Sequence, residues 1–161
     1  MKSDRLIKHL AIPAAIALVI YAVAYTGIEH LRYRKGPWLV SFSRDADMPA
    51  LRIDQAALGI TNVVIGFLGE PAPTHTVAAW DFSRPREVPY DVPFGECVFM
   101  DTTFLPGTVV FEMFGHEIQL LPRALTIDKR ETAWQSGMVL HLWSSPGARK
   151  GDTPGMPASR R

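Results

Sequence analysis

The organisation of this chain is decided by the stretch LAIPAAIALVIYAVAYTGI, residues Leu10–Ile28. Its 19 residues include no charged side chain. The hydrocarbon core of a bilayer is about 30 Å thick, and about 20 mostly apolar residues in a helix cross it. The sequence therefore predicts a transmembrane helix over residues 10–28, preceded by a short basic tail, residues 1–9.

Two other interpretations of this stretch remain open. Ala22-Val23-Ala24 has the A-x-A pattern of a signal-peptide cleavage site, and a basic segment and an apolar run precede it. The apolar run nevertheless continues to Ile28, beyond the roughly 7–15 residues of a usual signal peptide, so an uncleaved signal anchor is favoured. A buried core helix is the weakest alternative, because the stretch lacks the polar face expected of such a helix.

The charges that flank the stretch are balanced. Three Lys/Arg side chains precede it and three follow it in a basic connector, residues 29–37: Lys2, Arg5 and Lys8, then Arg32, Arg34 and Lys35. The positive-inside rule therefore does not decide the topology. A short basic N-terminus before an apolar run usually stays in the cytoplasm, which favours an extracytoplasmic domain, on the periplasmic side if the source is bacterial. The first expected partner is the lipid bilayer. The cations of the connector could meet lipid phosphates, but the favoured interpretation is that they only stop transfer of the chain and extend toward the interface.

The rest of the chain has the size and charge of one acidic domain followed by a basic tail. Residues 36–143 hold seven Lys/Arg against thirteen Asp/Glu, a net charge of −6. This charge argues against nucleic acid as a partner, because phosphate contacts require a basic face. Cys97 is the single cysteine, so the domain relies on a hydrophobic core rather than on a disulfide. The tail, residues 144–161, is rich in Gly, Pro and Ser and lacks aromatic residues, which predicts disorder.

Residues 38–143 have the alternating pattern of an all-β domain. Trp38, Val40 and Phe42 share one face of the first expected strand, and similar β-branched and aromatic runs recur between Gly, Pro and Asp. Single strands are predicted over residues 38–43, 51–54, 60–67, 76–82, 96–101, 124–128 and 138–143. Residues 83–94 contain three prolines and are expected to cross from one sheet to another. The predicted fold class is an antiparallel β-sandwich or jelly-roll-like domain.

The clearest single element is a β-hairpin. Residues 108–114 and 117–121 alternate in hydrophobicity on either side of Gly115-His116. A two-residue loop with glycine first is typical of a type II′ turn. We expect this hairpin to contribute centrally to the core.

Catalytic, cofactor and metal motifs do not emerge from the sequence, and no residue is assigned to such a role. His116-Glu117 lacks the second histidine of a zinc-protease helix, and His75 and His141 are isolated in the sequence. Cys97 lies in an apolar strand with no base beside it, which is typical of a buried thiol. No cofactor is expected, and the sequence favours a non-enzyme.

Four tryptophans are candidates for ligand binding: Trp38, Trp80, Trp134 and Trp143. Together they would make a platform on which a sugar ring can stack. Aromatic residues on strands more often pack in a core or at a sheet edge, however, so packing is the favoured interpretation and the platform is the alternative.

Three classes of function follow from these observations. The favoured one is a single-pass accessory or assembly subunit whose extracytoplasmic β-domain binds a larger membrane protein complex. The alternative is a membrane-tethered carbohydrate- or lipid-binding module. An enzyme is the weakest, because His75, His116 or His141 would have to meet acidic side chains in one cleft.

Overall fold

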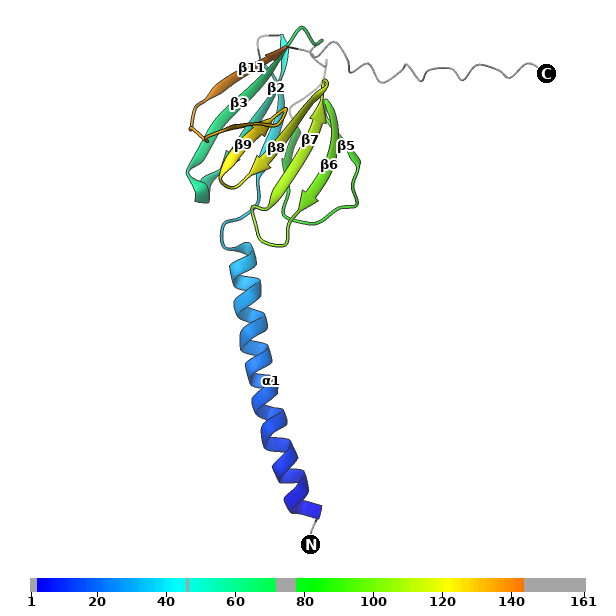
Figure 1. Cartoon of the computed structure of the whole chain (residues 1–161), viewed down its shortest axis with the longest axis vertical. Coiled ribbons are helices and arrows are strands. Elements are labelled where there is room, and N and C mark those ends of the chain that lie inside the picture. Colours follow the sequence, from blue (N-terminus) through cyan, green and yellow to red (C-terminus); the bar gives the residue numbers. More distant parts are fainter. Residues whose placement is uncertain (1–2, 46, 72–77, 144–161) are drawn as a thin grey trace, which may run out of the picture.

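The computed structural model describes residues 3–45, 47–71 and 78–143 (Figure 1). They form one long helix, α1 (Ser3–Tyr33), followed by a β-rich domain that lies at the end of the helix. The predicted disorder of residues 144–161 falls outside the described residues, and so does His75.

Helix α1 is longer at both ends than the predicted span, residues 10–28. Its segment Leu10–Tyr33 is 24 residues long, has a mean hydropathy of 2.0, and is not buried by the rest of the structure. Large apolar side chains such as Leu18 and Val23 are each 68% exposed. A buried core helix is therefore excluded for this segment. By length and composition, α1 fits a membrane anchor and a signal sequence alike.

The described part of the domain contains two sheets. The first has the strand order β11-β3-β2-β1-β4, with the bounds β1 Leu39–Asp45, β2 Met48–Gln55, β3 Ile60–Leu68, β4 Ala78–Asp81 and β11 Val139–Trp143. The second has the order β10-β9-β8-β7-β6-β5, with the bounds β5 Tyr90–Val92, β6 Gly95–Asp101, β7 Thr108–Met113, β8 His116–Leu121, β9 Ala124–Ile127 and β10 Arg130–Thr132. A short 3₁₀ helix, η1 (Ala56–Leu58), connects β2 to β3.

The expectation of purely antiparallel pairing is wrong at one edge of the first sheet. Strand β11 runs parallel to β3, with Val139 opposite Val64. The chain reaches β11 directly from β10, which belongs to the other sheet. Because this passage between the sheets supplies the crossover that a parallel pair needs, β11 can enter beside β3 in the same direction.

Most of the predicted strands are present, and the proline-rich connection crosses between sheets as predicted. It leads from β4 in the first sheet to β5 in the second. Strands β5 and β10 were not predicted, since each has only three residues. Such short strands show little periodicity.

The hairpin formed by β7 and β8 is confirmed, but its turn is shifted by one residue. Met113 pairs with His116, so the two loop residues are Phe114 and Gly115. Both have positive φ, 49° and 81°, which is the pattern of a type I′ turn rather than type II′. His116 therefore opens β8 and is buried, whereas the prediction placed it in the turn.

The buried faces of both sheets contribute to one hydrophobic cluster. Phe42 from β1 meets Phe111 from β7 edge-on, with ring centroids 6.3 Å apart. Phe82, just after β4, meets the same Phe111 ring at 5.5 Å. The largest fully buried side chains are Trp38, Phe42, Phe67, Phe82, Phe111, Leu51, Ile53, Ile65, Met113, Ile118, Leu120 and Leu125.

Candidate binding surfaces

Of the four predicted tryptophans, Trp38 is in the core and Trp134 is half-buried against it. Trp38 is fully buried, and its indole Nε1 donates to Gly107 O at 3.1 Å. Trp134 lies against it, with ring centroids 5.3 Å apart, and donates from Nε1 to Leu121 O at 2.8 Å. The prediction that a ligand stacks on Trp38 is therefore wrong, because the Trp38 ring is covered by the core.

The other two tryptophans lie at opposite edges of the first sheet. Trp80 is on β4 and Trp143 ends β11, which are the two outer strands in the described sheet order. Trp143 is 73% exposed, and Trp80 is half-buried. These two rings cannot contribute to one shared platform, so each has to be considered with its own neighbours.

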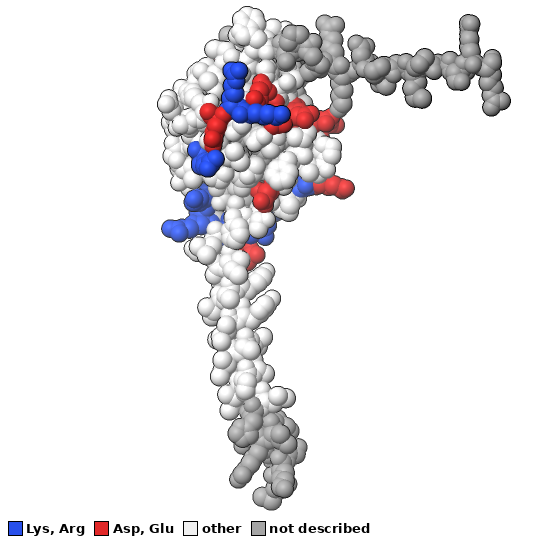
Figure 2. Space-filling view, viewed as in Figure 1, with Lys and Arg blue, Asp and Glu red and all other residues white. Residues whose placement is uncertain are grey.

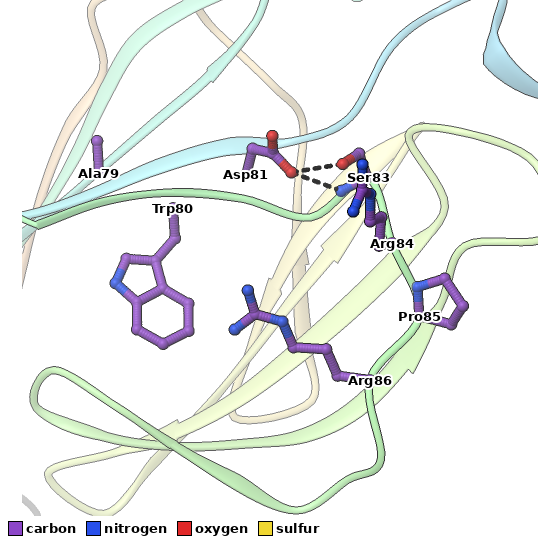
Figure 3. A pocket seen from close by; sticks show the side chains of 7 residues that line it. All are labelled: Ala79, Trp80, Asp81, Ser83, Arg84, Pro85 and Arg86. Carbon is purple, nitrogen blue, oxygen red and sulfur yellow. Dashed lines mark hydrogen bonds between the residues drawn. The ribbon is translucent and has the colours of Figure 1, made fainter.

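Trp80 lies beside an open depression of about 720 Å³ (Figure 3). Its ring stacks on Tyr90 of β5, with centroids 6.1 Å apart and planes within 11° of parallel. The guanidinium of Arg86 lies over both rings, 5.0 Å from the Trp80 centroid and 5.5 Å from the Tyr90 centroid. The other side chains of the lining are those of Ala79, Asp81, Ser83, Arg84 and Pro85.

The polar side of the depression consists of a turn at residues 81–83 and the cationic side chains of Arg84 and Arg86. Asp81 accepts from Ser83 N at 3.0 Å and from Ser83 Oγ at 2.6 Å. These bonds, with the charges of Arg84 and Arg86 nearby, lower the pKa of Asp81. An exposed guanidinium held on an aromatic face suits a ligand that carries both an anionic group and an apolar or sugar ring.

His116 joins the two sheets through hydrogen bonds. Its Nδ1 lies 2.6 Å from Asp128 Oδ2, and its Nε2 lies 2.8 Å from Trp143 O, at the end of β11. Each ring nitrogen thus lies within hydrogen-bond distance of an oxygen. Burial raises the pKa of Asp128, but the hydrogen bonds from His116 and Glu117 N outweigh burial, and the net shift is downward.

The two histidines of the enzyme hypothesis that the structure describes have different surroundings. His141 is exposed on β11, whereas His116 is buried at the start of β8, and His75 is outside the described residues. Within residues 3–45, 47–71 and 78–143, no three His, Cys, Asp or Glu side chains are grouped so that they could hold a metal ion. Cys97 is buried, and burial raises the pKa of its thiol, which disfavours the reactive thiolate.

The junction between α1 and the domain is a contact that sequence reasoning missed. Leu105 N donates to Arg32 O at 2.9 Å, and Arg32 Nε donates to Thr102 O at 3.4 Å. On the other side of the connector, Gln55 Nε2 donates to Gly36 O and Pro37 O at 2.9 and 2.8 Å. No local pattern signals these bonds, because the partners are far apart in the chain.

Comparisons of the chain with protein-family models, curated proteins and solved structures find no match. The functional argument therefore rests on the geometry of these surfaces alone.

Proposed function

We propose that this protein is a single-pass membrane-anchored accessory subunit, whose two sheets pack as a β-sandwich that binds a larger membrane protein complex. The observation that carries the proposal is α1. Its segment Leu10–Tyr33 is 24 residues long, has a mean hydropathy of 2.0 and is not buried by the domain, to which the helix is bonded end-on through Arg32 and Leu105. A helix with this much exposed apolar surface requires an apolar environment.

The best candidate for the protein-binding edge is β11. In the described residues it pairs on one side only, with β3. Val139 and Trp143 on this strand are 54% and 73% exposed. An edge strand with exposed apolar side chains is a common template for pairing with another chain. The basic N-terminus favours a cytoplasmic start and an extracytoplasmic domain.

A membrane-impermeant, amine-reactive crosslinker applied to intact cells or spheroplasts tests this proposal. Lys35 and Lys129 are exposed, so an extracytoplasmic domain should be captured with its partner. Trp143→Asp should abolish the crosslinked species, because it places a charge in the proposed contact. Arg123→Ala, at a side chain that is 83% exposed in the turn between β8 and β9, should leave it unchanged. The same crosslinks in wild type and Trp143→Asp would contradict the role of β11, and no crosslink in intact cells would contradict the proposed assembly outside the cytoplasm.

A second candidate function, the ligand-binding module, is favoured by the depression beside Trp80. The stacked Trp80 and Tyr90 rings with Arg86 suit a carboxylated sugar. Titration with oligogalacturonate should change the tryptophan fluorescence of the full-length protein in detergent, and Arg86→Gln should weaken the response about tenfold or more. Equal responses of the two proteins would contradict binding in the depression.

A further inference from the structure

The surface of the domain that surrounds the end of α1 includes the loop between β6 and β7, residues 102–107. Three contacts fix this loop to the chain around the junction. Leu105 N donates to Arg32 O at 2.9 Å, Arg32 Nε donates to Thr102 O at 3.4 Å, and Trp38 Nε1 donates to Gly107 O at 3.1 Å. The loop is therefore held beside the last turn of the helix.

The height of this loop along the helix axis follows from the residue to which it is bonded. Arg32 lies four residues beyond Ile28, the end of the uncharged stretch, which is about 6 Å further along the axis. The polar headgroup layer on each side of a bilayer is about 5–8 Å thick. With Ile28 at the edge of the hydrocarbon, the loop lies at the depth of the lipid headgroups.

The chemistry of the exposed groups at this level matches that layer. Phe104, on the loop, is 58% exposed although its ring is large and apolar. Tyr33 is 50% exposed at the end of α1, and the side chains of Arg34 and Lys35 are exposed just after it. Lys and Arg side chains lie around the point where α1 joins the domain (Figure 2). Aromatic rings and cations together are typical of groups that lie at an anionic membrane surface.

We propose that Tyr33, Arg34, Lys35 and Phe104 form a membrane-facing surface, which binds the headgroup layer of an anionic bilayer. This inference rests on the proposed anchoring of α1 and adds a second contact with the same bilayer. The domain then sits on the membrane in one orientation and does not swing freely on a tether. Strand β1 starts near the junction and leads away from it (Figure 1). Strand β11 runs in the same direction as β1, because β2 is antiparallel to β1 and β3 and β11 is parallel to β3. Trp143, at the end of β11, is therefore at the far end of the domain and faces the aqueous phase.

Site-directed spin labelling of the full-length protein in vesicles tests this inference. The vesicles contain equal parts of phosphatidylcholine and phosphatidylglycerol. A nitroxide at Thr103→Cys reports on the loop and leaves Phe104 in place, Trp143→Cys reports on the far end, and Val19→Cys reports on the middle of α1. Wild-type protein is the labelling blank, because Cys97 is buried.

At position 103 we expect collisions with a water-soluble nickel complex to be severalfold less frequent than at position 143. Adding Phe104→Ser should raise the collision frequency at position 103 only in part, because the hydrogen bonds to Arg32 still hold the loop at the level of the headgroups. If positions 103 and 143 are equally accessible to the nickel complex while position 19 collides mainly with oxygen, α1 is inserted and the membrane-facing surface is wrong. If position 19 is also accessible to the nickel complex, the anchoring of α1 itself is wrong.

Discussion

Gly107→Ala is expected to destabilise the β-rich domain by about 3–5 kcal/mol. Gly107 has a φ of +70°, a conformation that costs a residue with a side chain about 1–2 kcal/mol. A Cβ at this position would also lie 1.9 Å from Asp101 O and 3.0 Å from Asp101 C, which are backbone atoms. Neither atom can move aside unless the β6–β7 loop changes shape, so the clash adds to the conformational cost.

Gly59→Ala is the matched control. Gly59 has the same φ of +70°, but a Cβ there meets nothing within 4 Å. It should cost only about 1–2 kcal/mol, the conformational part of the effect. Urea unfolding of the full-length protein in mild detergent, followed by near-ultraviolet circular dichroism, measures both values. Similar losses in the two variants would show that the loop accommodates a Cβ and that the close approach at Gly107 does not matter.

Gly107→Ala should also disturb the junction between the domain and α1, because the loop that contains Gly107 is bonded to the helix. Gly107 O accepts the bond from Trp38, and Leu105 two residues earlier donates to Arg32 O. A loop forced into another shape cannot keep both bonds. The stability of the domain and the position of the proposed membrane-facing surface therefore depend on the same few backbone atoms.

The elements that could be predicted from sequence are those whose signal is local. The uncharged stretch Leu10–Ile28 identified the helix, since length and composition alone decide whether a helix is apolar enough to span a bilayer. Alternation around Phe42 and Phe111 identified strands and their buried faces, because side chains on a strand point to opposite faces in turn. The helix bounds were less well predicted, since flanking charged residues continue a helix without adding to its apolar signal.

The features that were missed depend on contacts between distant segments. His116 was expected in a turn. The turn lies one residue earlier than predicted, so His116 is in β8, where it bonds to Asp128 and to Trp143 O. The parallel pairing of β11 depends on which sheet the preceding strand belongs to. Trp38 and Trp80 look alike in sequence, but only the arrangement of the sheets decides that one is covered and the other lines a depression.

Phe111→Ala is expected to destabilise the protein by about 3–5 kcal/mol, because it removes a buried ring and leaves a cavity. Phe111 belongs to the second sheet, and its ring meets Phe42 and Phe82 from the first-sheet side at 6.3 and 5.5 Å. The cavity would thus open between the two sheets. If the sheets pack as a sandwich around one core, unfolding should remain a single transition with an unchanged dependence on urea.

Phe99→Ala on the neighbouring strand β6 supplies the comparison for this test. Phe99 is 49% exposed, so its truncation removes little buried surface and should cost less than about 1 kcal/mol. The two variants delete the same atoms, and the difference between their free energies of unfolding therefore reports the burial of Phe111 between the sheets. A loss for Phe111→Ala as small as that for Phe99→Ala, or two separate unfolding transitions, would mean that the sheets do not share a core. The sandwich on which the proposed docking edge depends would then be wrong.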